Sequence, residues 1–218
     1  MKIPFTIKEF LNVFKHYNNT IFPMQIILLL LAVIAVILII KKHEKSNLYI
    51  SLILSFFWLW MGIVYHILFF SSINKGAIVF GILYILQAFL FFITGVLKAK
   101  LSFKFRFDIY GIVGSVYFLY ALIIYPILGY FLGHIYPRTP TFGAPCPTTI
   151  FTFGVLLFAS KKIPKYLLII PLIWSIIGFS AAINLHITED LGLFLAGLLG
   201  VLLIVIKDRK RNNVLNRS

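Results

Sequence analysis

Residues 21–40 read IFPMQIILLLLAVIAVILII and carry no charged side chain. An α-helix needs about 20 apolar residues to cross a hydrocarbon core of about 30 Å. Lys41 and Lys42 follow directly, as polar residues do where a helix leaves the membrane. The stretch therefore predicts a membrane-spanning helix, and it sets the pattern that the remainder of the chain repeats.

The composition agrees with this interpretation. The chain has 218 residues, of which 61% are hydrophobic and 12% are charged, and its mean hydropathy is +1.01. A soluble domain is about half apolar and about a quarter charged. These values exclude a disordered chain and an ordinary soluble enzyme. Cys146 is the single cysteine, so no intramolecular disulfide can form.

Seven segments have the apolar character of a span, and short polar loops separate them. They are residues 21–40, 48–70, 77–97, 107–131, 147–160, 166–184 and 190–206. Lipid offers the backbone no hydrogen-bond partner, so helices are the expected crossing structure. We expect an all-α membrane protein, a bundle of about seven transmembrane helices (21–206) preceded by an N-terminal segment (1–20) and followed by a basic tail (207–218).

The Lys and Arg residues predict the orientation of this bundle. Alternate connections hold fifteen and five of the twenty basic residues, and the basic side of a membrane protein is the cytoplasmic one. We expect a multi-pass protein of a bacterial inner membrane with its N-terminus outside. The net charge of +14 then encodes orientation and contact with the bilayer, including anionic lipids near residues 207–211, and does not indicate a nucleic-acid partner.

The N-terminal segment has a helical pattern of its own. Thr6 and Glu9 have capping-box spacing, and apolar residues recur every three or four positions up to Phe14. We expect a short amphipathic helix over residues 6–17. It lies on the outer membrane surface or packs on the bundle as an ordinary helix.

Small residues and tryptophans predict where helices meet. Gly129 with Gly133, and Gly192 with Gly200, have the spacing that lets helix backbones approach closely in lipid. Trp58, Trp60 and Trp174 lie near the middle of their spans. An indole N–H needs an acceptor, so we expect these tryptophans to face the interior.

The fifth segment is unusual because it is too short. Fourteen residues make a helix of about 21 Å, and the preceding residues 135–146 contain three prolines and a glycine. Irregular backbone at membrane depth has to be buried in protein or line a wet cavity. We expect an outward-facing pocket into which the loop with Cys146 dips. The free backbone N–H groups of Thr148 and Thr149, at the start of a helix that begins at Pro147, are expected to face this pocket. The alternative is that the side chains of these residues only cap the helix.

Histidines gather on the predicted outer side. His66, His134 and His186 are candidate metal or haem ligands. His66, His134 and Asp190 are also candidate residues for binding a small ligand. No local spacing ties them together. Equally, imidazoles favour interfaces, and Glu189 with Asp190 suits the first turn of the last helix.

The predicted spans contain no charged residue near their middle, and the chain has no motif of a known hydrolase or nucleotide-binding site. Our leading hypothesis is a non-enzymatic module that binds or senses a small ligand in the outer pocket. A membrane enzyme or redox partner with a metal or haem is one alternative. A small-solute transporter is another, and it would need a polar path past Gln87.

Several motifs resemble one bacterial membrane family, the domain of unknown function 6064. They are Trp58-Leu59-Trp60-Met61 with Tyr65-His66, the run Pro140-Thr141-Phe142-Gly143-Ala144-Pro145-Cys146-Pro147-Thr148-Thr149, and Glu189-Asp190-Leu191-Gly192-Leu193. The family more often carries Gln-Asp where this chain has Glu189-Asp190. The resemblance implies a multi-pass bacterial inner-membrane protein and brings no known activity or catalytic residue.

Overall fold

The computed structural model of the chain describes residues 4–185 and 187–215, with side chains as far as residue 211. The helices in chain order are α1 (Ile7–Ile21), α2 (Met24–Lys41), α3 (Ser46–Trp60), α4 (Ala77–Phe91), α5 (Ile109–Leu119), α6 (Tyr125–Phe131), α7 (Pro145–Leu157), α8 (Tyr166–Leu185) and α9 (Leu191–Leu215). Wider or tighter turns extend several of them: η1 (Met61–Phe69), η2 (Phe70–Ser72), η3 (Phe92–Leu97), η4 (Tyr120–Ile124) and η5 (Thr188–Asp190).

Six helical segments in the described part of the chain are long and apolar enough to cross a membrane. They are Met24–Lys41, Ser46–Ser72, Ala77–Leu97, Ile109–Phe131, Tyr166–Leu185 and Thr188–Arg211. The predicted fifth span corresponds to the shorter apolar helix α7. The expected all-α membrane fold is confirmed, with six full-length helices and a short seventh one where seven spans were predicted.

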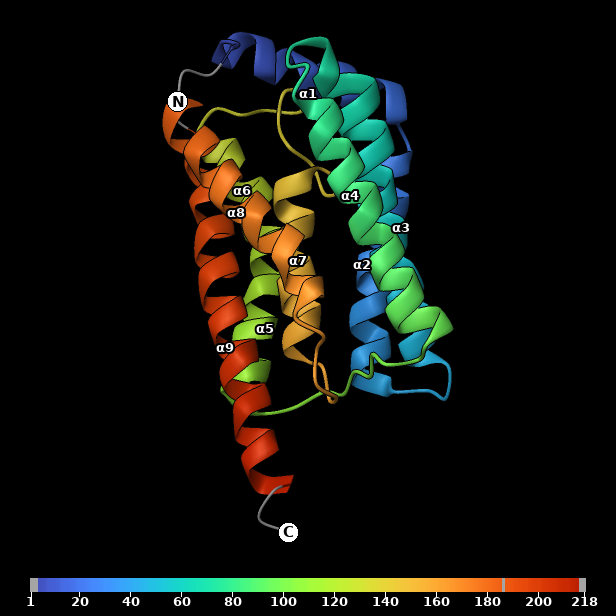
Figure 1. Cartoon of the computed structure of the whole chain (residues 1–218). Helices are drawn as coiled ribbons and strands as arrows, with labels where there is room; N and C mark the ends of the chain where they lie inside the picture. The colour runs from blue at the N-terminus through green and yellow to red at the C-terminus, as the bar shows by residue number, and fades with distance from the viewer. Residues whose placement is uncertain (1–3, 186, 216–218) are drawn as a thin grey trace.

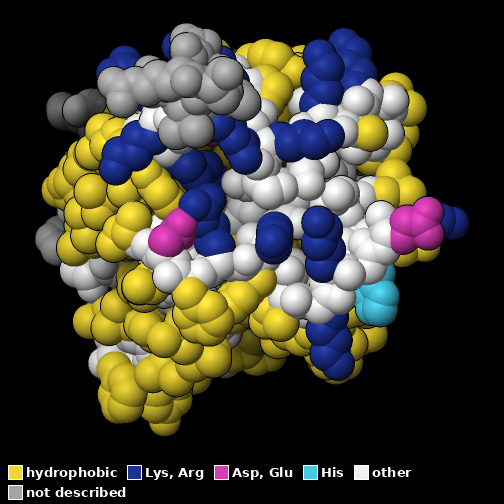
Figure 2. Space-filling model, turned by 90° about the horizontal axis from the view of Figure 1, so that it is seen from below, with side chains coloured by type: hydrophobic (Ala, Val, Ile, Leu, Met, Phe, Trp, Pro, Cys, Tyr) yellow, Lys and Arg dark blue, Asp and Glu magenta, His cyan; other side chains and the backbone are white. Residues whose placement is uncertain are grey.

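The bundle has two distinct ends (Figure 1). The α1 end carries α1, the connection between α3 and α4, the loop between α6 and α7, and the turn between α8 and α9. The basic end carries the other connections, and Lys and Arg side chains gather on it (Figure 2). Hydrogen bonds hold its loops together: Ser160 N donates to Ser102 O over 2.6 Å, and Phe103 N donates to Asn47 Oδ1 over 2.8 Å. The connections therefore group by end as the basic-residue count predicts.

Helix α7 is the centre of the bundle rather than one of its walls. Twelve of its thirteen residues are buried, and it contacts α5, α8 and α9. Thirteen residues give about 20 Å, short of a core of about 30 Å, and α7 starts well below α1 (Figure 1). It begins at Pro145 rather than at the expected Pro147. Proline suits the first helical position because its missing N–H would have no partner there.

Helix α1 lies across one end of the bundle (Figure 1). The predicted capping box is present: Glu9 N donates to Thr6 Oγ1, and Thr6 N donates to Glu9 Oε2 over 2.7 Å. The Thr6 backbone bond holds the pKa of the exposed Glu9 carboxyl below its usual value. The helix continues to Ile21, and its buried side chains are Val13, Phe14, Tyr17, Asn18 and Ile21. The C-terminal half of α1 thus packs on the bundle.

One predicted small-residue contact is present and one is not. A Cβ at Gly192 would overlap the Tyr120 ring, so α9 approaches η4 closely there. The Gly129–Gly133 pairing is wrong, because α6 already ends at Phe131. Gly133 has φ +88°, and no atom of the described residues lies within 4 Å of the place that a Cβ would take, so it serves the turn that ends the helix.

Candidate functional site

A buried acidic cluster lies at the α1 end, where the α6–α7 loop meets the start of α9. Glu189 in η5 is fully buried, and its Oε1 lies 2.6 Å from His134 Nδ1. Tyr120 donates its hydroxyl to the backbone oxygen of Glu189 over 2.7 Å. Gly129 borders this arrangement, and a Cβ there would lie 3.4 Å from Glu189 Oε1 and 3.3 Å from Thr139 Oγ1.

The second carboxylate of the cluster, Asp190, is buried beside Tyr125 and Cys146. Tyr125 donates its hydroxyl to Asp190 Oδ1 over 2.5 Å. The Cys146 thiol lies next to the same carboxylate at the start of α7. We call His134, Glu189, Asp190, Tyr125 and Cys146 the acidic cluster. Cys146 keeps part of its surface accessible, whereas the other four are buried.

His66 lies in an aromatic box that adjoins this cluster. Its ring centroid is 4.6 Å from that of Tyr84 and 5.0 Å from that of Trp174. Tyr65, Phe70 and Phe80 complete the box at 5.2, 6.1 and 5.9 Å. Trp174 also faces Cys146. A chain of contacts therefore runs from His66 through Trp174 and Cys146 to the two carboxylates and His134.

π-helical turns supply residues to both parts of this chain. Tyr65 and His66 lie in η1. Tyr120 is the first residue of η4, and Tyr125 follows directly after the last one. A π-helical turn inserts an extra residue and re-aims the side chains of its helix, and such turns are frequent at functional sites. The local geometry of α3 and α5 thus directs polar groups inward at the α1 end.

Thr148 and Thr149 differ in what they do. Thr148 Oγ1 accepts a 3.1 Å hydrogen bond from Gly143 N, and Thr148 N donates to Ala144 O. The backbone N–H of Thr148 is therefore used inside the helix and does not face a pocket, because α7 starts two residues earlier than expected. The Thr149 hydroxyl faces that of Tyr84 but does not reach hydrogen-bond geometry.

Buried polar atoms without a partner accumulate around this chain of contacts. Among the described residues they are Nδ1 and Nε2 of His66, Tyr84 Oη, Thr139 Oγ1, Thr149 Oγ1, Trp174 Nε1 and Glu189 Oε2. Leaving such a group unpaired costs about 1–3 kcal/mol, and buried polar groups are nearly always paired. Seven of the eleven unpaired buried atoms in the described part of the chain lie in this region, which makes it the candidate site for a bound ligand.

Helix α1 covers this region, and we call the contacts of its residues Tyr17 and Asn18 the latch. Asn18 is fully buried and donates to the backbone oxygens of Pro137 and Thr139, each over 2.8 Å. Thr141 Oγ1 donates back to Asn18 Oδ1 over 2.9 Å. Tyr17 donates to Gly143 O over 3.1 Å and accepts from Trp60 Nε1. The irregular loop is thus held to the bundle by two neighbouring residues of α1.

Around the middle of α7 the bundle interior is mostly apolar. Trp58 donates to Thr152 Oγ1 over 3.1 Å, and buried aromatic side chains fill the space around α7: Phe57, Phe118, Phe151, Phe153 and Phe158. Gln87 donates to Leu167 O over 3.1 Å and thereby joins α4 to α8. This packing counts against a polar transport path in the conformation described.

The three candidate metal-binding histidines do not form one group in the described part of the chain. His66 lies in the aromatic box, His134 pairs with Glu189, and His186 falls outside the described residues. Within those residues no set of three or more His, Cys, Asp or Glu side chains could hold a metal ion. A metal or haem site on these histidines stays a prediction.

The sequence analysis missed four residues of the site. Tyr17, Asn18, Tyr120 and Tyr125 carry the latch and the carboxylate contacts. Asn18 offered one usable signal, because it follows Phe14 by four positions on the apolar face of α1. The two tyrosines of η4 and α6 gave none, since tyrosine is common in apolar spans.

Comparison with known proteins places the chain in a family. The model of the family of unknown function DUF6064 matches residues 7–215, and the chain belongs to that family. No curated protein and no solved structure matches the chain.

Proposed function

We propose that this member of the DUF6064 family is a multi-pass inner-membrane protein that binds or senses a small ligand on its outer side. The observation that carries the proposal is the set of buried, unpartnered polar atoms beside two carboxylates under α1. A core built only for stability would pair or replace them. The binding residues proposed are His66, His134, Cys146, Thr149 and Asp190, joined by Glu189; Thr148 supports the loop.

The chemistry of the cluster favours a ligand that carries hydrogen-bond donors and positive charge. Glu189 Oε2 is a buried acceptor without a partner, and Asp190 is a second carboxylate one residue away. Among the described residues, His134 is the one imidazole paired with a carboxylate of the cluster, and its contact with Glu189 Oε1 leaves Oε2 open to a donor. A primary ammonium group could donate to Glu189 Oε2 and to the Asp190 carboxyl group, and its positive charge would lie beside these oxygen acceptors.

The distribution of basic residues supports the outward direction of this site. Fourteen of the Lys and Arg residues in the described part of the chain belong to the end opposite the acidic cluster, and that excess is typical of the cytoplasmic side. With the basic end inside, α1 and the acidic cluster face outward. A ligand would then arrive from outside the cell.

Thermal unfolding of the full chain in detergent tests the proposal with two probes of equal charge. Ethylammonium has three N–H donors and tetramethylammonium has none. We expect saturable stabilisation by ethylammonium alone, because a ligand that binds only the folded state raises its stability. The effect should disappear in Glu189→Gln and in Thr139→Val, which removes an unpaired buried hydroxyl that, like Glu189, borders Gly129.

Glu44→Gln is the matched control, because Glu44 is an exposed carboxylate after α2. It should respond to ethylammonium like the unmodified chain. Absence of saturable stabilisation, or an equal loss in Glu44→Gln, would overturn the proposal. Stabilisation by a divalent metal ion instead, lost in His134→Ala, would favour the metal-binding alternative.

A further inference from the structure

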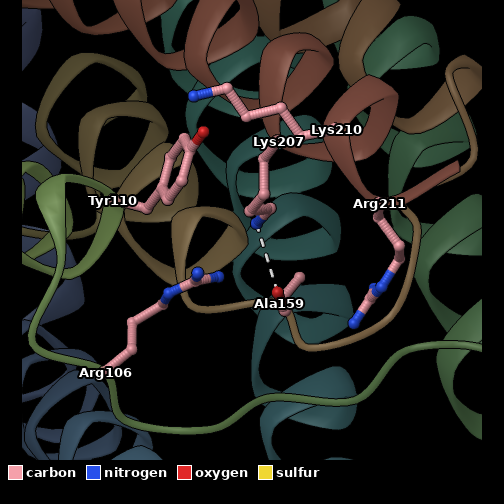
Figure 3. A pocket seen from close by; sticks show the side chains of 6 residues that line it. All are labelled: Arg106, Tyr110, Ala159, Lys207, Lys210 and Arg211. Atoms are coloured by element: carbon pink, nitrogen blue, oxygen red, sulfur yellow. Dashed lines mark hydrogen bonds between the residues drawn. The ribbon is translucent and has the colours of Figure 1, made fainter. Parts of the chain in front are cut away.

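The basic end contains a cavity that is separate from the acidic cluster. This cavity of about 250 Å³ lies where the start of α5, the end of α7 and the end of α9 meet. Its lining residues are Arg106, Tyr110, Ala159, Lys207, Lys210 and Arg211 (Figure 3). Four of these six side chains are cationic.

The cavity exists because α7 ends early. Its last carbonyls lie inside the bundle, and Lys207 of α9 reaches them: its Nζ donates to Leu157 O over 3.1 Å and to Ala159 O over 3.2 Å. Lys207 is only 8% exposed. An ammonium suits this position, because the C-terminus of a helix carries partial negative charge. Neutral carbonyls hold the Lys207 ammonium in place without cancelling its charge.

The other cations are fixed around Lys207 in different ways. Arg106 pairs with Asp108 and lies 4.9 Å from the Tyr110 ring centroid. Arg106 also lowers the pKa of Asp108 through its hydrogen bond, against the raising effect of partial burial, so that carboxylate is charged. Arg211 donates to Ser160 O, and Lys210 is exposed.

The charges around the cavity leave a positive excess. Asp108 balances Arg106, and the other nearby carboxylate, Asp208, accepts from Ile163 N over 3.1 Å. Among the described residues, neither Lys207, Lys210 nor Arg211 forms an ion pair with a carboxylate. The Asp208 carboxylate still offsets part of the charge of these three cations, and a bound anion would balance the positive charge that remains.

We propose that this cavity binds a phosphate group. Its volume is several times the roughly 30 Å³ that one water takes in the liquid, so a tetrahedral anion with part of its hydration fits. Guanidinium groups bind phosphate oxygens through paired N–H donors, and lysine adds a compact charge. The phosphate belongs either to a lipid headgroup or to a soluble compound, because both can reach a cavity at the basic end of the bundle.

Phosphate-dependent thermal unfolding of the full chain in detergent tests this site. One arm uses inorganic phosphate, and the other uses mixed micelles containing phosphatidylglycerol or, for comparison, phosphatidylcholine. We expect saturable stabilisation in at least one arm. Stabilisation by inorganic phosphate identifies a soluble source of the phosphate group. Stabilisation by phosphatidylglycerol but not by inorganic phosphate identifies a lipid headgroup, and either result supports the site.

The decisive comparison uses two double variants that each remove two positive charges. Lys210→Gln with Arg211→Gln changes the cavity, whereas Lys162→Gln with Arg209→Gln changes exposed residues that do not line it. We expect about a tenfold weaker apparent affinity in the cavity variant, as the loss of charged hydrogen bonds implies, and less than about twofold in the control.

Equal weakening in both double variants would overturn the proposal, because it would show general attraction to a basic surface. So would the absence of saturable stabilisation in both arms. Unfolding temperatures measured without phosphate show whether each variant is folded. Lys210→Gln alone, at an exposed side chain, provides a milder second variant with the same expected direction.

Discussion

His134 Nδ1 lies 2.6 Å from Glu189 Oε1 in a buried contact that joins the α6–α7 loop to the start of α9. The residues are 55 positions apart in the chain. Burying either polar side chain alone would cost free energy, so each of the two side chains needs the other as its partner. This contact holds the acidic cluster against the α6–α7 loop.

Removing either partner should destabilise the fold strongly. We expect His134→Ala and Glu189→Ala each to lower the free energy of unfolding by about 3 kcal/mol, because the remaining polar group stays buried without its partner. The double variant should lose at least about 1 kcal/mol less than the two single losses together. Reversible unfolding in mixed micelles measures all four species, and strictly additive losses would show that the contact contributes no coupling.

The Asn18 latch should control access to the cluster. Asn18→Ala removes three hydrogen bonds to the α6–α7 loop, and we expect Cys146 to react with a soluble thiol reagent several times faster. Asn19→Ala is the control, because Asn19 is the next residue of α1 and is exposed. Equal reaction rates in Asn18→Ala and in the unmodified chain would mean that α1 does not restrain the loop.

Lys207 should be a determinant of stability despite its place in a basic segment. Lys207→Met removes a buried cation that three carbonyls of the α7 end accept from. We expect a loss of about 2–3 kcal/mol in the free energy of unfolding, the range for a charged hydrogen bond left unmade. Lys210→Met, at an exposed neighbour, should change it by less than about 0.5 kcal/mol. Similar values for both variants would contradict the capping role.

Two glycines should respond differently to alanine. Gly192→Ala drives a methyl group into the Tyr120 ring, and accommodating it should cost about 1–3 kcal/mol. Gly133→Ala meets no described neighbour within 4 Å, so its cost of about 1 kcal/mol should come from φ +88° alone. Gly133→Asn should recover part of that loss, since asparagine tolerates this conformation. The same recovery with Gly192→Asn would contradict the packing explanation.

Much of the fold follows from the sequence because lipid imposes simple rules. Apolar runs such as residues 21–40 predicted the crossing helices, and the short run of residues 147–160 predicted an incomplete one. The boundaries were less accurate where a side chain far along the chain decides them. Helix α1 continues past Tyr17 to Ile21 because Tyr17 and Asn18 bond to the α6–α7 loop.

The candidate site was predictable only in part. Asp190 and His134 stood out because charged and titratable residues are rare in this chain, and both lie in the buried acidic cluster. Their partner Tyr125 is one tyrosine among eleven, and only the fold brings it to Asp190. Lys207 was expected among lipid-facing basic residues, yet it is buried, because the end of α7 needs a donor that no local pattern reveals.

The central claim is that the acidic cluster is reached from outside the cell, and Cys146 reports on it directly. Cys146 is the only cysteine and adjoins Asp190, so a membrane-impermeant thiol reagent can be applied to intact cells and to inverted membrane vesicles without further engineering. Cys146→Ser supplies the background. We predict labelling in intact cells that ethylammonium slows and little labelling in inverted vesicles. Labelling only in inverted vesicles, or in neither preparation, would contradict an outward-facing site.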